Sequence, residues 1–211
     1  MNYTDFTIVR HGESEWNVNN RIQGQYDVQL TDIGIEQSKI TAQYLKDEPF
    51  DSVWSSDLRR TSYLGKLLAK NLSTELNYDS GLRELNAGIL QGKLPYEAAA
   101  LYPDLKKICV DDPEFEIPGG ESYKELWERV VSTFNSIAEK KFGRKVAIVS
   151  HGGAIRVLLK HAMDYYKEWI RPEIVNCAIS RFRCYENLRW QLIEWNNSSH
   201  LGNTTTLDDK G

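Results

Sequence analysis

The sequence predicts an α/β fold, a three-layer sandwich in which helices cover both faces of a mostly parallel central sheet. Short apolar and β-branched runs at residues 6–9 and 145–150 are typical of buried strands. Segments with helical spacing of apolar residues separate the strand-like runs, and this alternation favours a parallel sheet. Both of these runs end close to a histidine followed by a glycine. Because active groups of such folds lie at the carboxyl ends of the strands, both histidines are expected at one sheet edge.

The first half of the chain alternates strands with helices. Thr31 and Asp32 are typical of a helix start, and Asp57 is expected to cap the next helix. Apolar residues recur at helical spacing after each of these starts. The expected elements are strand 6–9, helix 31–45, strand 52–55, helix 57–71 and strand 74–78.

Glycine and proline recur in the middle of the chain, at about residues 86–120, and both residue types break regular structure. We expect one short helix there, at residues 96–102, within an otherwise irregular excursion. Segments of this length are often functional lids, so the excursion is expected to be lid-like.

The last part of the chain returns to regular elements. Apolar residues at core spacing predict a long helix, and two alternating runs predict a hairpin with its turn at residues 186–188. Asparagine, serine, threonine and aspartate dominate the end, so residues 201–211 are expected to form a loose tail. The expected elements are helix 122–141, strand 145–150, helix 153–163 and strands 179–185 and 190–195.

Length and composition indicate one globular domain, at residues 1–200 of the 211-residue chain. A net charge of −4 gives no reason to expect nucleic acid or an anionic membrane as a partner. Three cysteines without the spacing of a metal site favour reduced thiols and a cytoplasmic location. The first residues do not resemble a secretory signal, and the longest apolar runs are too short to span a bilayer. The sequence does not indicate an oligomeric state.

Basic residues gather where the predicted strands end. Arg10 precedes His11, and Arg59 and Arg60 stand at the start of the helix after the second strand. Helix starts favour anions, and the guanidinium fork matches phosphate oxygens. With His151 from the other strand, this set suits phosphoryl transfer through a histidine, where positive groups neutralise the phosphoryl charge without a metal.

Neutral donors and one carboxyl complete the set. Asn17, Gln23 and Gly24 follow His11 in a loop, and Glu84 stands at the mouth of the excursion. A carboxylic acid at that position could protonate the leaving oxygen of a phosphate ester.

These motifs, in their order along the chain, resemble those of the histidine phosphatase superfamily. This group contains cofactor-dependent phosphoglycerate mutases and many small phosphatases. The resemblance covers about residues 6–200 and implies a phosphoglycerate mutase-like fold. It rests on Val9-Arg10-His11-Gly12-Glu13-Ser14-Glu15-Trp16-Asn17, Gln23-Gly24, Leu30-Thr31, Ser55-Ser56-Asp57-Leu58-Arg59-Arg60-Thr61, Leu82-Arg83-Glu84, Gly119-Gly120-Glu121-Ser122 and Val149-Ser150-His151-Gly152.

The resemblance implies a catalytic role for three residues. His11 is implied to be the nucleophile that becomes phosphohistidine, and Glu84 the general acid that later activates water. His151 is implied to act in catalysis and to bind the phosphoryl group. The implied phosphate-binding residues are Arg10, Asn17, Arg60 and His151.

Three further residues are implied to contact substrate: Gln23, Gly24 and the backbone at Gly152. Arg60 is preferred over Arg59 as the phosphate ligand because the family's arginine stands directly before a small residue, here Thr61. Arg59 is expected to be a solvated surface residue.

Other candidate groups are better explained as structural. His161 and His200 lack partner motifs. Cys177 and Arg183 have the spacing of cysteine-dependent phosphatases, but the residues between them contain no glycine and alternate like a strand. Metal and nucleotide motifs are absent from the sequence, so no metal or cofactor is expected.

The sequence favours a phosphomonoesterase that is independent of metals and acts on a small phosphorylated metabolite. The alternative is a cofactor-dependent phosphoglycerate mutase, for which bisphosphoglycerate would be the cofactor. Residues 86–120 contain six carboxylates and no arginine; their basic residues are Lys93, Lys106 and Lys107. This balance suits water better than a polyanion as the acceptor of the phosphoryl group. A non-catalytic phospholigand-binding protein is the remote alternative.

Overall fold

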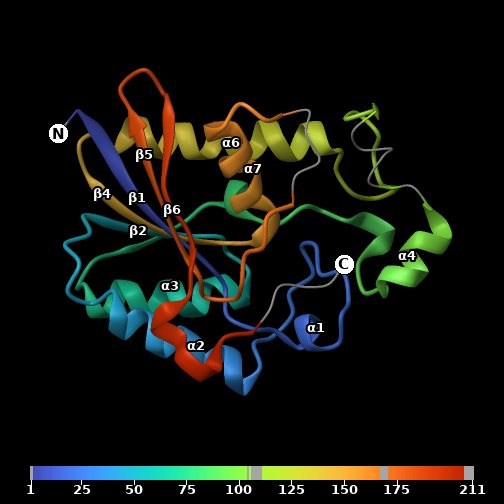
Figure 1. Cartoon of the computed structure of the whole chain (residues 1–211), viewed down its shortest axis with the longest axis horizontal. Helices are drawn as coiled ribbons and strands as arrows, with labels where there is room; N and C mark the ends of the chain where they lie inside the picture. Colours follow the sequence, from blue (N-terminus) through green and yellow to red (C-terminus); the bar gives the residue numbers. More distant parts are fainter. Residues whose placement is uncertain (1, 104, 106–110, 167–170, 207–211) are drawn as a thin grey trace.

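The structure, a computed structural model, describes residues 2–103, 105, 111–166 and 171–206. Its centre is a six-stranded mixed sheet with the strand order β3-β2-β4-β1-β5-β6 (Figure 1). The strands are β1 (Tyr3–Arg10), β2 (Ser52–Ser55), β3 (Leu76–Tyr78), β4 (Lys145–Ser150), β5 (Ile179–Tyr185) and β6 (Trp190–Asn197).

The sheet has a parallel part and an antiparallel part. The four strands from β3 to β1 run parallel, as the alternation of strands and helices predicts. β5 runs antiparallel to β1, and β6 pairs with β5 as the expected hairpin. β1 and β4 are buried along most of their length, which fits their continuous apolar runs.

Helices cover both faces of the sheet (Figure 1), so the predicted three-layer fold is confirmed. On one face, α2 (Asp32–Tyr44) and α3 (Arg59–Asn71) enclose a core around Val9, Val53 and Leu64. On the other, α6 (Tyr123–Lys140) and α7 (Gly152–Ala162) enclose a core around Ile8 and Phe134. Apolar side chains of β1 alternate between these two cores.

The excursion after β3 has a small core of its own. η1 (Ser80–Leu82) precedes it, and it contains η2 (Gly88–Leu90) and α4 (Pro95–Leu101), which projects at the right of Figure 1. Leu90, Ala98 and Ile117 are buried there, with Ile22 from the loop after β1 packed beside them. Its described part is therefore anchored to that loop, while Lys106, Lys107 and Cys109 lie outside the described residues.

The structure corrects the predicted cap of α3. This helix begins at Arg59 with Leu58 as its N-cap. Asp57 instead accepts hydrogen bonds from the Arg83 guanidinium, with 2.7 Å between Arg83 Nε and Asp57 Oδ1. The guanidinium fork donates to both oxygens of this carboxylate and carries the opposite charge, whereas a cap bond would use one backbone N–H, so the long-range partner prevails.

The end of the chain is more ordered than the predicted loose tail. Residues Ser199–Thr204 form the turns of η3, and Leu201 is buried in the core beside α2. His200 Nε2 lies 2.9 Å from Thr41 Oγ1, and its ring stacks on Tyr44 with 4.8 Å between ring centroids. These contacts are the ones expected of a structural histidine, as predicted for His200. Residues 207–211 lie outside the described part of the chain.

Across the described residues, no helix is both long and apolar enough to cross a membrane.

Candidate active site

The two motif histidines lie side by side at the end of the sheet. β1 and β4 are neighbours, and Arg10 pairs in register with Ser150, so the next residue of each strand is a histidine at the same level. The backbone N–H of His11 donates to Ser150 O at 3.0 Å. The His11 and His151 rings are 5.2 Å apart between centroids, and both side chains are buried. The predicted convergence of these two imidazoles is therefore present.

Hydrogen bonds define which nitrogen of each ring faces the site. His11 Nδ1 lies 2.7 Å from Gly12 O. Because a carbonyl can only accept, Nδ1 must carry the proton, and in the neutral ring Nε2 then holds the lone pair. His151 Nε2 lies 2.9 Å from Ser56 Oγ, and its buried Nδ1 has no hydrogen-bond partner among the described residues. A phosphoryl oxygen would satisfy that nitrogen.

Arg60 is buried at the start of α3 and belongs to the site. It is among the largest fully buried side chains of the protein. Its guanidinium donates to Tyr26 O and Gly24 O, each at 2.7 Å, which fixes its plane. Arg59 points outward and pairs with Asp27 at 3.0 Å, so the two arginines lie where the sequence predicts.

Arg10 adds a second buried guanidinium. Only 3% of its surface is exposed, and its Nη1 donates to Ile174 O. An ideal Cβ built on Gly152 would lie 3.6 Å from Arg10 Nε, so this guanidinium lies beside the first residue of α7. Two buried guanidiniums at a buried histidine pair create a region that attracts anions.

This environment keeps both imidazoles neutral. Burial, and then the charges of Arg60 and Arg10, hold the pKa of His11 well below its usual range. Burial, Arg60, His11, Arg10 and Arg129 do the same to the pKa of His151. At pH 7 the His11 ring is therefore neutral, as a nucleophile must be.

The low pKa values make the stability of the fold depend on pH. In the unfolded chain both rings take up protons near pH 6.5, while in the folded protein they do so only at lower pH. The free energy of unfolding is thus expected to fall below pH 6.5, by at most about 1.4 kcal/mol per pH unit for each ring. Urea unfolding between pH 5 and 7.5 measures this slope.

The variant His11→Asn isolates the contribution of one ring to this pH dependence. His161 and His200 also have lowered pKa values, caused first by burial, and they contribute in the same direction. The slope between pH 5 and 6.5 should therefore be shallower in His11→Asn than in the wild type. Equal slopes in the two proteins would contradict a neutral, buried His11.

The carboxylate of Glu84 contacts the first turn of α7. Its Oε2 accepts from the Gly153 N–H at 2.9 Å, and its Oε1 accepts from the Leu85 N–H at 2.8 Å. Gly153 is two residues beyond His151, so these contacts bring the carboxylate to the end of the sheet that carries the histidines. The excursion thereby supplies the acidic group that the sequence predicts.

The loop after β1 supplies the neutral groups. Asn17 Oδ1 accepts from the Ser14 N–H at 3.0 Å, so the NH₂ end of the amide is the one that could donate to a phosphoryl oxygen. Gln23 is buried, with its Oε1 2.8 Å from Ser14 Oγ. Gly24 has φ +53°, a left-handed conformation that favours glycine, and it presents its carbonyl to Arg60. The binding roles of Asn17, Gln23, Gly24 and Gly152 stay predictions.

Three residues with no assigned role in the sequence argument support this arrangement. Ser56 holds His151, as described above. Asn176 is fully buried, and its Nδ2 donates to His11 O at 3.1 Å. Arg129 donates to Arg83 O at 3.1 Å and to Glu84 O at 3.2 Å. Ser56 lies inside a recognised motif, but nothing near Asn176 or Arg129 in the sequence indicates partners so far away.

Cys177 and His161 have structural surroundings. Burial raises the pKa of the Cys177 thiol to about 12, which suppresses the thiolate that a cysteine nucleophile requires. His161 is half-buried on α7, edge-on to Trp127. In the part of the chain that the structure describes, no group of three or more metal-ligating side chains could hold a metal ion.

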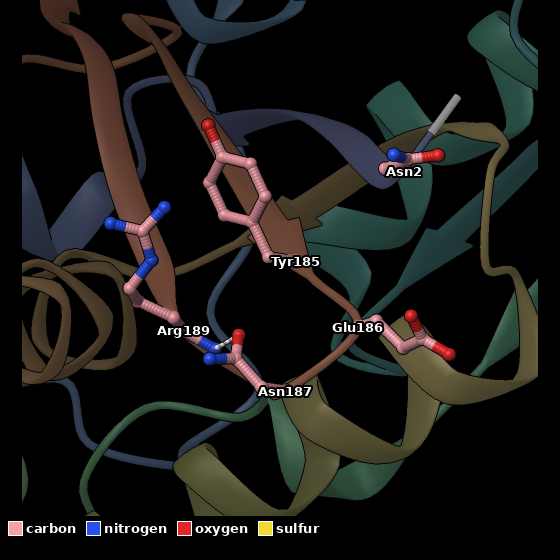
Figure 2. Close-up of a pocket in the computed structure, with 5 residues that line it drawn as sticks. All are labelled: Asn2, Tyr185, Glu186, Asn187 and Arg189. Carbon is pink, nitrogen blue, oxygen red and sulfur yellow. Dashed lines mark hydrogen bonds between the residues drawn. The ribbon is translucent and has the colours of Figure 1, made fainter.

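A surface hollow elsewhere shares no residue with this site. Figure 2 shows its lining at the β5–β6 turn, where the Arg189 guanidinium lies over the Tyr185 ring, 4.5 Å from the centroid. Tyr185 pairs with Tyr3 at the start of β1, so the hollow is at the opposite end of this strand from His11. Its lining residues are Asn2, Tyr185, Glu186, Asn187 and Arg189.

The fold and the paired histidines indicate a class of protein, and comparison of this chain with known proteins identifies that class. The family model of the histidine phosphatase superfamily (branch 1) matches residues 6–198. The chain therefore belongs to the histidine phosphatase superfamily, and the resemblance seen in its motifs is confirmed.

Two curated relatives carry mutase names. Phosphoglycerate mutase-like protein 4 of Arabidopsis thaliana is 33% identical, over 98% of this chain and 91% of its own length. The probable phosphoglycerate mutase GpmB of Yersinia pestis (strain Pestoides F) is 36% identical, over 95% of this chain and 94% of its own length.

Similar solved structures carry phosphatase names. The mycobacterial glucosyl-3-phosphoglycerate phosphatase has a TM-score of 0.82 at 25% identity, and the match covers 93% of this chain and 100% of that one. A phosphoserine phosphatase mutant from Entamoeba histolytica, in complex with phosphoserine, has a TM-score of 0.80 at 25% identity over 94% and 99%. Both sets of relatives support an enzyme that acts on phosphate esters.

Proposed function

We propose that the protein is a phosphomonoesterase that works through a phosphohistidine on His11 and needs no metal. The observation that carries this proposal is the pair of buried, neutral imidazoles beside two buried guanidiniums at one sheet edge. This arrangement supplies a nucleophile and the charge that stabilises a phosphoryl group, both from the protein itself.

In the first step, His11 Nε2 attacks the phosphorus of the ester. The N–P bond forms as the bond to the ester oxygen breaks, and Glu84 gives its proton to that oxygen. Arg10 and Arg60 neutralise the charge on the non-bridging oxygens, and the Nδ1–H of His151 and Asn17 donate hydrogen bonds to them. The Nδ1–H of His11 remains bonded to Gly12 O, which keeps the ring oriented throughout.

In the second step, a water molecule attacks the phosphorus of phosphohistidine. Glu84, now ionised, takes a proton from the water as the P–N bond breaks. His11 returns to its neutral form and inorganic phosphate leaves. One carboxyl group thus serves as acid and then as base.

A small phosphorylated metabolite is the proposed substrate class. The names of the structural neighbours support it, since glucosyl-3-phosphoglycerate and phosphoserine are both small esters. The proposal includes no nucleic acid or membrane partner. Free thiols at Cys177 and Cys184 support a cytoplasmic location.

Phosphoglycerate mutase is the second candidate function. The names of the curated relatives favour it, and bisphosphoglycerate would then be a cofactor. Water as acceptor is favoured by residues 86–120, which contain no arginine to hold a bisphosphate. The described part of that segment packs around its own apolar cluster, where Ile117 is 3% exposed.

Coupled assays on one preparation are expected to show hydrolysis as the faster activity. Without clamping arginines, phosphohistidine should lose its phosphoryl group to water before a second substrate oxygen arrives. Phosphate release from the best ester of a phosphometabolite panel should exceed interconversion of 3- and 2-phosphoglycerate, with bisphosphoglycerate supplied. Fast, bisphosphate-stimulated isomerisation with negligible phosphate release would establish the mutase instead.

A further inference from the structure

The contact between Glu84 and the start of α7 leaves no room for a side chain at residue 153. A Cβ built on Gly153 would lie 1.9 Å from Glu84 Oε1 and 2.9 Å from its Cδ, which is closer than real Cβ contacts allow. The same glycine donates its N–H to Glu84 Oε2 at 2.9 Å. The carboxylate therefore rests directly on the backbone of Gly153, held by a hydrogen bond.

The peptide segment that carries Glu84 is held separately. Arg129 Nη2 donates to Glu84 O at 3.2 Å and Gln25 Nε2 donates to the same oxygen at 3.1 Å. Glu121 pairs with Arg129 and accepts from the Asn86 N–H at 2.8 Å. These bonds fix the backbone of Glu84, whereas the amides of Leu85 and Gly153 are what hold its carboxylate.

We propose that Gly153 is a positioning residue for the general acid: its missing side chain and its N–H seat the Glu84 carboxylate beside His151. This inference rests on the proposed function, in which Glu84 transfers the proton. Proton transfer requires heavy atoms within hydrogen-bond reach, so a carboxylate displaced from this seat would protonate the leaving oxygen poorly.

Gly153→Ala is the direct test, because the three heavy atoms nearest to the built Cβ all belong to the Glu84 carboxylate. Gly153 is a helical residue, and alanine is favoured over glycine in helices. The conflicting atoms are the far end of a flexible side chain, which can rotate away. The variant should therefore fold with an unchanged or higher Tm, and only the position of the Glu84 carboxylate should change.

The effect should depend on the leaving group. With an alkyl ester such as phosphoserine, whose oxygen needs a proton to leave, we expect Gly153→Ala to lower the single-turnover rate of His11 phosphorylation at least about 10-fold. With p-nitrophenyl phosphate, whose leaving group is acidic, this rate should change less than about threefold. The substrate concentration that gives half of the maximal phosphorylation rate should stay within about twofold for both probes, since the phosphoryl-binding groups are untouched.

A double-mutant cycle provides the matched control. In a Glu84→Ala background no carboxylate remains to be seated, so adding Gly153→Ala should cause no further loss with phosphoserine, measured as His11 phosphorylation in a rapid quench. An equal loss with both probes, an additive loss in the cycle, or full activity of Gly153→Ala would overturn the inference. A wild type that forms no phosphohistidine would instead overturn the proposed function.

Discussion

His11→Ala is expected to abolish both turnover and the covalent intermediate. Enzyme quenched during turnover of a labelled phosphate ester should carry an acid-labile, base-stable phosphoryl group, and the variant should carry none. The reason is that alanine removes Nε2, the nucleophilic atom of the proposed mechanism, while Arg10 and Arg60 cannot replace it. Mass spectrometry of the quenched protein locates the label.

Two controls accompany this experiment. His161→Ala makes the same substitution at a half-buried histidine that packs on Trp127, away from the paired imidazoles, and should leave the label in place. Incubation of the wild type with a chelator should leave activity intact, since the proposed chemistry uses only protein groups. Full activity in His11→Ala, or complete loss of activity with the chelator, would refute the mechanism.

Glu84→Gln is expected to slow phosphorylation of His11 by about 10²- to 10⁴-fold, the usual contribution of a proton-transfer group. The amide keeps the size of the side chain but cannot give a proton to the leaving oxygen. Single-turnover rates with a series of esters measure the effect. The loss should be largest for alkyl leaving groups and smallest for acidic phenols, which depart without protonation.

Glu116→Gln is the matched control for this substitution. Glu116 is an exposed carboxylate in the same excursion, so the same chemical change there should leave phosphorylation unaltered. An equal effect of Glu84→Gln on good and poor leaving groups would show that another group is the acid.

The sheet and the pairing of the two histidines were predictable because their signals are local. Apolar runs mark β1 and β4, and Ser122 with Glu125 forms the capping box at which α6 begins. The adjacency of His11 and His151 follows from the rule that parallel strands of such folds present their carboxyl ends together. The strand pattern and the His-Gly motifs were therefore enough to predict that the two imidazoles lie together.

The supporting contacts were not predictable because their partners are distant in the chain. Asp57 has the local signature of a helix cap, but Arg83, 26 positions away, competes for it. η3 is rich in polar residues, which are typical of a loose end. His200 nevertheless contacts α2, and Leu201 packs in the core beside that helix. Arg129 acts on carbonyls 45 to 48 positions earlier. No periodicity or motif records such pairings.

The position of β1 has a consequence for how the chain folds. The strand that delivers His11 is the first of the chain, yet its two neighbours, β4 and β5, come from residues 145–185. The Asn176 bond to His11 O spans 165 positions. Closing loops of this size costs entropy before native contacts compensate for it, and folds dominated by such contacts form slowly. During synthesis, β1 is therefore expected to lack its native strand neighbours until residues 145–185 have left the ribosome, so neither of the two cores that its side chains join can form around it before then.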